Sequence, residues 1–238
     1  MAQAPLVKFR TQGHIAIFTL DRPKQRNAVN AQVSQELEAH LDAFEANDDL
    51  WTGIICSSAP ERAFCAGADL AAISRRENIA TAKGGFAGLT MRERTKPLIA
   101  VVGGPAFAGG CEIVLACDLV VANTNARFAV PEVKRSLVAA AGGLFRLPQK
   151  IPVNIAMEMI LTGDPISAQR AFDVGLVNRL VPAEKGPQHL FDEAVKLANT
   201  INQNAPLAVQ ESKQLVDQLR LAEDSDAFLE SYSVCADC

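Results

Sequence analysis

The sequence predicts a mixed α/β fold with a helical C-terminal section. Up to Pro148, short apolar runs alternate with segments whose apolar positions recur at helical spacing. Beyond Pro148 nearly every patterned segment has the helical spacing, and no linker or low-complexity tract separates the two parts. The chain has 238 residues, of which 49% are hydrophobic and 21% charged, so it is long enough to bury a core without disulfides or a structural metal.

The first hundred residues contain three predicted strands and two predicted helices. The strands are His14–Leu20, which is stopped by Asp21-Arg22-Pro23, then Gly53–Cys56 and Leu98–Val102. The first helix spans Ala31 to Phe44, because its apolar residues recur every three or four positions, and the second begins near Asp69. The Gly-rich stretch Thr81 to Gly88 is weakly patterned, and we expect it to be mobile.

The rest of the chain begins with a turn from Gly103 to Gly110 that leads into an apolar helix ending near Cys117. Short strands are then expected at Leu119–Ala122, Arg127–Val130 and Leu176–Val181. The predicted helices of the C-terminal part are Val153–Leu161, Ser167–Phe172, Leu190–Ile201 and Leu207–Leu221.

Composition argues against several classes of protein. The net charge of −4 and the pI of about 5.5 argue against a nucleic-acid-binding protein, although Lys134 with Arg135 leaves room for a local basic patch. The N-terminus lacks the pattern of a signal peptide, and the longest uncharged run, Pro97 to Cys111, is broken by glycines and a proline, so no membrane span is expected.

Cysteines and histidines carry no recognisable site pattern. The six cysteines do not have the spacing of a secreted disulfide framework, and the single Cys235-Ala-Asp-Cys238 has no second pair. We therefore expect buried free thiols in a reducing cytoplasm. The three histidines lie far apart without metal-ligand spacing, which argues against a zinc enzyme or a Ser-His-Asp hydrolase.

Two glutamates are candidates for chemistry. Glu112 is the only charged residue between Lys96 and Asp118, and its apolar neighbours predict burial, which is costly for a carboxylate unless it is paired or used. It could equally be a helix N-terminal glutamate that interacts with free amides. Pro131 fixes the backbone before Glu132, which can aim that side chain, but a solvated loop glutamate is the simpler interpretation.

Two small-residue segments precede predicted helices. Ala108-Gly109-Gly110 and Phe64-Cys-Ala-Gly-Ala-Asp69 both remove bulk where a backbone turns into a helix, which permits close approach of another molecule. Each could also be a purely structural turn, with Asp69 capping its helix, and Asp118 is interpreted as a structural acid. The sequence contains no Walker-type Gly-Lys-Ser/Thr loop, and Gly84-Gly85-Phe-Ala-Gly88 does not match a dinucleotide fingerprint after a strand.

Taken together, the segments resemble the crotonase, or enoyl-CoA hydratase/isomerase, superfamily, from about Leu6 to about Leu229. Each motif alone is weak, but their order is specific. The motifs are Leu20-Asp-Arg-Pro-Lys-Gln-Arg-Asn-Ala28, Arg62-Ala-Phe-Cys-Ala-Gly-Ala-Asp69, Lys96-Pro-Leu-Ile-Ala-Val-Val102, Phe107-Ala-Gly-Gly-Cys-Glu-Ile-Val-Leu-Ala-Cys-Asp118, Phe128-Ala-Val-Pro-Glu-Val133, Ala141-Gly-Gly-Leu-Phe-Arg-Leu147 and Met157-Glu-Met-Ile-Leu-Thr-Gly-Asp164.

The resemblance implies an acyl-CoA site. The backbone amides of Ala68 and Gly109 would form an oxyanion hole for the thioester carbonyl, Glu112 would hold and deprotonate the attacking water, and Glu132 would protonate C2. The residues implied to line the CoA path are Ala28, Ala66, Ala68, Asp69, Leu70, Ala71 and Gly109. No metal or redox cofactor is implied, because coenzyme A belongs to the substrate.

The resemblance also implies a right-handed spiral of ββα repeats with a helical trimerisation section. We expect a core over residues 1–185 carrying the site, helices over 186–238, and a homotrimer or hexamer. Three departures from the family pattern stand out: Gly103-Gly104-Pro105 replaces an Asn-Gly turn, Ala108 replaces the first of three glycines, and the sequence ends at Cys238, before a further helical stretch that is usual in the family.

The leading hypothesis is hydration of a 2-enoyl-CoA, since both glutamates are present. Double-bond isomerisation is the alternative within the superfamily, because one carboxylate can move a proton between C2 and C4. Decarboxylation, thioester hydrolysis and carnitinyl-type dehydration are also compatible with the same scaffold. A non-catalytic CoA-binding protein is the alternative from another class.

Overall fold

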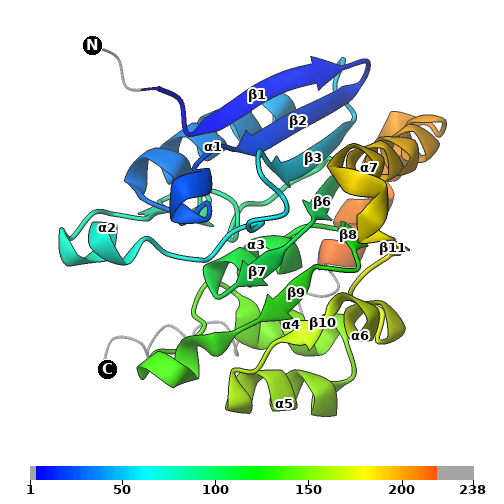
Figure 1. The fold of residues 1–238 in the computed structure, drawn as a ribbon. Helices are drawn as coiled ribbons and strands as arrows, with labels where there is room; N and C mark the ends of the chain where they lie inside the picture. Colours follow the sequence, from blue (N-terminus) through cyan, green and yellow to red (C-terminus); the bar gives the residue numbers. More distant parts are fainter. Residues whose placement is uncertain (1–3, 219–238) are drawn as a thin grey trace.

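The computed structural model of the chain describes residues 4–218, and its largest element is a six-stranded sheet (Figure 1). In spatial order the strands are β1 (Val7–Gln12), β2 (Ile15–Leu20), β3 (Thr52–Ser57), β6 (Leu98–Val102), β8 (Leu119–Asn123) and β11 (Arg179–Val181). β1 and β2 form an antiparallel hairpin, whereas the pairs from β2 to β11 are all parallel. Parallel neighbours need crossover connections, which the helices and the second sheet provide.

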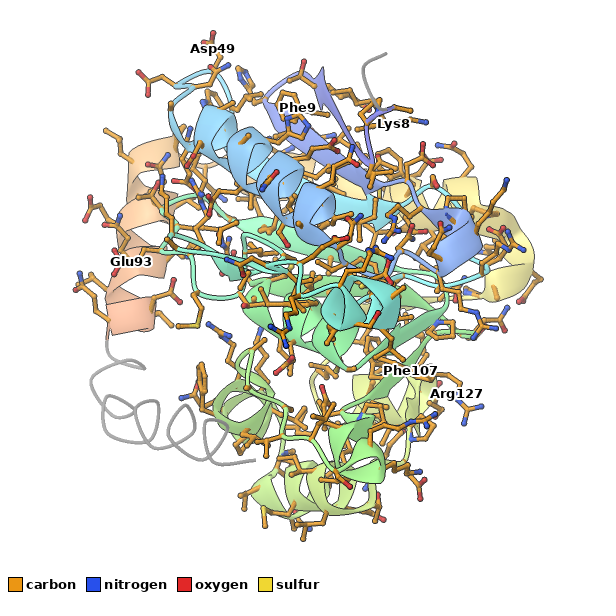
Figure 2. The ribbon with its side chains drawn as sticks, turned by 90° about the vertical axis from the view of Figure 1, so that its left-hand side faces the viewer. Lys8, Phe9, Asp49, Glu93, Phe107 and Arg127 are labelled. Carbon is orange, nitrogen blue, oxygen red and sulfur yellow. The ribbon has the colours of Figure 1, made fainter. Side chains whose placement is uncertain are left out.

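A three-stranded sheet forms a second layer. Its order is β10 (Ile166–Ser167), β9 (Arg127–Ala129) and β7 (Pro105–Phe107). In the parallel pair Phe107 faces Ala129 and Pro105 faces Arg127, and Figure 2 shows Phe107 and Arg127 at the same edge of the molecule. Because β6 leads into β7, and β8 into β9, after only a few residues, the chain passes twice from the large sheet to the small one. This strand–strand–helix succession is the predicted ββα spiral.

Helices cover both faces of the large sheet. α1 (Ala31–Glu45) buries Val33, Leu37, Leu41 and Phe44, the positions that predicted it, and Phe9 of β1 stacks on His40 with ring centroids 5.2 Å apart (Figure 2). On the opposite face, α7 (Gly186–Asn202) contacts β3, β6 and β8. Since both faces are covered, every residue of β3 and β6 is buried, as is typical of parallel strands.

The remaining helices and short strands are η1 (Pro23–Gln25), α2 (Leu70–Ser74), β4 (Ala80–Thr81), β5 (Gly85–Phe86), α3 (Gly109–Ala116), η2 (Pro131–Arg135), α4 (Gly143–Lys150), α5 (Val153–Thr162), α6 (Ala168–Asp173) and η3 (Ala183–Lys185). Of these, α3 contacts β7 of the small sheet, and α6 contacts β9 and β10. Residues 206–218 are also helical. No helix within residues 4–218 is long and apolar enough to cross a membrane.

Several elements differ from the sequence prediction. β1, β4, β5, β7, β10 and α4 were not expected, and Pro148 lies inside α4. The stretch from Thr81 to Gly88 forms the β4–β5 hairpin, and Phe86 and Ala87 are buried. The C-terminal part of the predicted helix 207–221, and the pair Cys235 and Cys238, lie outside the described residues.

Candidate active site

α3 begins where the backbone turns sharply out of β7. Ala108, the residue before the helix, has φ +52° and ψ −131°, a backbone conformation that residues other than glycine rarely adopt. Gly110 packs so closely on the loop below it that a Cβ there would lie 2.1 Å from the carbonyl oxygen of Cys65. The first turn of α3 is therefore held tightly against the loop that precedes α2.

Glu112 lies in this first turn and its side chain is buried, as the sequence predicted. Its Oε1 accepts a hydrogen bond of 2.9 Å from the backbone N–H of Gly143, at the start of α4. Burial, reinforced by the charge of Glu132, raises the pKa of Glu112 to about 7. Near neutral pH this carboxyl therefore exists in both protonation states, as a group that gives or takes a proton must.

Glu132 lies in η2, directly after Pro131, and is half-buried. Its Oε2 is buried and has no hydrogen-bond partner among residues 4–218. Burial raises the pKa of Glu132 as well. The two glutamates are close enough for Glu132 to raise the pKa of Glu112, so the fold brings together two carboxyls that lie far apart in the sequence.

The amide of Ala68 is held in place by the strand-like pairing of its loop with Val29. Val29 N–H donates to Gly67 O, and Asp69 N–H donates to Val29 O, both at 2.8 Å. In this parallel bridge the Gly67 carbonyl and the Asp69 N–H, on either side of Ala68, face Val29. The N–H of Ala68 itself therefore points away from Val29. Within residues 4–218 this N–H has no acceptor.

The amide of Gly109 is the first of α3 and, within the described part of the chain, also has no acceptor. A Cβ built on Gly67 would lie 3.1 Å from this nitrogen, so the loop that carries Ala68 packs directly on the start of the helix. On its other side Gly109 touches Phe86, where a Cβ would lie 2.5 Å from ring carbons. The amides of Ala68 and Gly109 thus lie on two segments that pack against each other. They meet at a helix N-terminus, which favours negative charge.

The residues expected along the CoA path lie in the segment before Val29, in the loop before α2, at the start of α3 and in the first turn of α2. Ala28, Ala66, Ala68 and Asp69 are half-buried, whereas Leu70 and Ala71 in the first turn of α2 are exposed. Ala66 N–H donates to the carbonyl of Arg26 at 3.0 Å, which keeps this part of the loop beside Ala28. The segment of Ala28 and Val29 therefore adjoins the loop that carries Ala68.

Asp69 and Asp118 have the structural contacts predicted for them. Asp69 caps α2, since its Oδ1 accepts hydrogen bonds from the amides of Ala71 and Ala72. Asp118 pairs with the buried Arg94 at 3.0 Å and accepts the N–H of Leu98 at 2.7 Å, which fixes the far end of α3.

Sequence reasoning missed the residues that contact Glu112 from α4. The Gly143 amide holds its carboxylate, and the guanidinium of Arg146 lowers its pKa in opposition to burial. Arg146 also donates to the carbonyl of Thr90, so it joins α4 to the segment after β5. The signal was present in the motif from Ala141 to Leu147, which supported the resemblance but was not assigned to the site.

A cavity of about 490 Å³ lies beside these groups in the sequence but is not centred on them. It is lined by the last turn of α3, by α4, by residues 91–95 and by residues 213–218. Glu112, Glu132, Ala68 and Gly109 do not line it. Within residues 4–218 no three His, Cys, Asp or Glu side chains gather in the manner of a metal site.

Residues 10–230 match the profile of the enoyl-CoA hydratase/isomerase family. The chain belongs to this family. A short-chain-enoyl-CoA hydratase of Clostridium acetobutylicum is 36% identical to it, over 93% of this chain and 87% of that protein. A carnitinyl-CoA dehydratase of Proteus mirabilis is 41% identical, over 86% and 77% of the two chains.

Solved structures agree with this membership. The crystal structure of an enoyl-CoA hydratase from Mycobacterium tuberculosis H37Rv superposes with a TM-score of 0.87 at 43% identity, covering 97% of this chain and 89% of that one. The crotonase fold expected from the sequence is thereby confirmed, as is the place of the chain close to the enoyl-CoA hydratases of the family.

Proposed function

We propose that this protein is an enoyl-CoA hydratase that adds water across the 2,3 double bond of a 2-enoyl-CoA. The observation that carries the proposal is the pairing of two carboxyls, the buried Glu112 and the half-buried Glu132, with two amides that have no acceptor among the described residues, at the start of α3 and in the loop before α2. Its relatives named as hydratases, at 36–43% identity, support it.

In the proposed reaction the thioester carbonyl accepts hydrogen bonds from the amides of Ala68 and Gly109. Ionised Glu112 takes a proton from water as the water oxygen bonds to C3, and the electron pair of the double bond moves onto the carbonyl oxygen as an enolate. Protonated Glu132 then gives its proton to C2, and the carbonyl re-forms. Each oxyanion donor of this kind is worth roughly 2.7–4 kcal/mol in a well-studied enzyme.

The environment of each group suits its proposed step. With a pKa of about 7, Glu112 is partly ionised at neutral pH and still basic enough to accept a proton. Burial raises the pKa of Glu132, which is the direction that proton donation requires. Oε2 of Glu132 lacks a hydrogen-bond partner among the described residues, and water or substrate would supply one.

For the rest of the substrate, we propose that coenzyme A follows Ala28, Ala66 and residues 69–71, with no metal or redox cofactor. The exposed Leu70, at 74%, would offer apolar surface to the pantetheine arm. We further propose the division into a core (1–185) and a helical section (186–238), and assembly as a homotrimer or hexamer. We also propose a cytoplasmic location, in keeping with the free, buried thiols of the cysteines at positions 56, 65, 111 and 117. Light scattering of the purified protein tests the assembly.

The reaction is tested by following the loss of thioester-conjugated absorbance of crotonyl-CoA and of longer 2-enoyl-CoA esters. Glu112→Gln and Glu132→Gln should each lower kcat by about 10²-fold or more. Glu184→Gln, which changes an exposed glutamate of η3, is the matched control and should leave kcat unchanged. A folded wild-type protein that hydrates none of these esters would contradict the proposal.

A 3-enoyl-CoA substrate distinguishes hydration from double-bond isomerisation, the alternative within the family. If the protein moves the double bond without adding water, the product is the conjugated 2-enoyl ester and absorbance rises. Binding of acyl-CoA without turnover of either ester would instead identify a non-catalytic CoA-binding protein.

A further inference from the structure

Arg22 links three segments beside the candidate site. It follows β2, and only 12% of its side chain is exposed. One guanidinium nitrogen, Nη2, lies 3.0 Å from Oδ2 of Asp69, and the other, Nη1, donates to the carbonyl of Ala28. The guanidinium therefore joins the end of β2, the Ala28 segment and the start of α2.

Asp69 is held by Arg22 on one side and serves the helix on the other. Its Oδ1 accepts the amides of Ala71 and Ala72, while Oδ2 receives the guanidinium. Burial works to raise the pKa of Asp69, but the hydrogen bonds from Arg22 and Ala72 outweigh it and leave the pKa below its ordinary value. Asp69 is consequently ionised at neutral pH, and these three hydrogen bonds hold it at the start of α2.

The backbone of Arg22 contributes to the same construction. Its N–H donates to Oδ1 of the buried Asn27 at 2.9 Å, and Nδ2 of Asn27 donates to the carbonyl of Phe64 at 2.9 Å. The loop that carries Ala68 is thus attached through Asn27 near its beginning and through Asp69 at its end. Between these attachments lie the two hydrogen bonds with Val29 that orient the Ala68 amide.

We propose that Arg22 is a positioning residue that fixes the direction of the Ala68 N–H by anchoring Asp69 and Ala28 to each other. The proposal rests on the function proposed above, in which that N–H receives the thioester oxygen. Arg22 itself does not touch the reacting atoms. Its loss should therefore weaken polarisation of the carbonyl more than it weakens binding of the CoA ester.

The test uses Arg22→Met, which keeps an unbranched apolar side chain and removes the donors, Arg22→Lys, which restores a cation, and Asp69→Asn, which keeps an oxygen to cap α2. Arg75→Met is the matched control, because Arg75 forms an exposed ion pair with Glu77 just beyond the same helix. The readouts are kcat and KM with crotonyl-CoA, and the absorption band of bound 4-dimethylaminocinnamoyl-CoA. That band moves to longer wavelength when hydrogen bonds polarise the thioester carbonyl, so it reports on the amide directly.

We expect Arg22→Met and Asp69→Asn to lower kcat by about 10- to 100-fold, to change KM by less than about threefold, and to reduce the red shift of the saturated probe. Arg22→Lys should recover part of both, and Arg75→Met should match the wild type. Unfolding midpoints show which variants are folded. If Arg22→Met does not fold, Arg22→Lys and Asp69→Asn carry the same comparison.

A folded Arg22→Met protein with a full red shift would overturn the proposal. So would a fall in affinity alone, with kcat and the saturated band intact, because Arg22 would then serve CoA binding. A wild-type protein that shifts the probe but hydrates no ester would contradict the hydratase function and leave the Arg22 comparison valid. A wild-type protein that binds the probe without any shift would refute the role of the Ala68 amide, and that of Arg22 with it.

Discussion

Replacing Glu112 by glutamine is expected to stabilise the folded protein at alkaline pH and to have a much smaller effect in mild acid. Burial, reinforced by Glu132, raises the pKa of Glu112 from 4.5 to about 7. The folded state therefore keeps a proton that the unfolded chain has lost, so the free energy of unfolding falls as pH rises between about 4.5 and about 7. Glutamine is neutral throughout, and its Oε1 can still accept the N–H of Gly143.

The size of the effect follows from the pKa difference. Each pH unit between the two values is worth about 1.4 kcal/mol, so ionised Glu112 lowers the free energy of unfolding by roughly 3 kcal/mol once the pH exceeds about 8. At pH 5 most of the folded protein carries neutral Glu112, and the difference from the glutamine variant falls to about 1 kcal/mol.

The measurement is urea unfolding of the wild type and of Glu112→Gln at pH 5 and at pH 8.5. Glu184→Gln, at an exposed position, controls for a general effect of removing one carboxylate and should show no such pH dependence. An equal stability difference at the two pH values, or a variant less stable than the wild type at pH 8.5, would refute the assignment of a raised pKa to Glu112.

Three other predictions follow from the site and its supports. Because Glu112 must be ionised to take a proton from water, kcat/KM should fall about tenfold from pH 8 to pH 6, with a midpoint near 7; a midpoint near 4.5 would exclude Glu112 as the base. Gly109→Ala puts a Cβ 2.5 Å from the Phe86 ring, so kcat should fall, and the double variant with Phe86→Leu should recover part of it; unaltered kinetics of the single variant would show that the ring moves aside freely. Asp118→Asn leaves the buried Arg94 without its counter-charge, so urea unfolding at pH 7 should reveal a loss of about 3 kcal/mol or more, and a loss within experimental error would show that Arg94 finds another partner.

The sequence predicted most of the regular elements because their burial pattern is local. The stripe of Val33, Leu37 and Leu41 predicts α1, and the apolar run Leu98–Val102 predicts β6 with the observed bounds. β1 was missed because only Val7 of its six residues is buried, so the strand has no apolar period. α4 was missed because Pro148, which stands near its end, resembled a boundary.

The candidate site could be predicted only in part for a related reason. The apolar neighbours of Glu112 predicted a buried acid. Glu132, by contrast, resembled an ordinary loop residue until the motifs were taken together. The Gly143 amide that holds Glu112, and the guanidinium of Arg22, are tertiary contacts between segments 31 and 47 positions apart. No local pattern contains such a contact, and the resemblance named the motifs without stating what their side chains touch.

Ala108 has a backbone conformation that glycine would adopt more easily, and this affects both the stability of the protein and the rigidity of the turn before α3. Glycine would adopt φ +52° and ψ −131° without steric conflict, so the methyl group costs folding stability at the entrance to α3. The methyl group of Ala108 also packs against Gly67: a Cβ built on Gly67 would lie only 2.8 Å from the Cβ of Ala108. Alanine at position 108 allows the turn before α3 fewer backbone conformations than glycine would. Replacing it by glycine would therefore make this turn less rigid and the folded protein more stable.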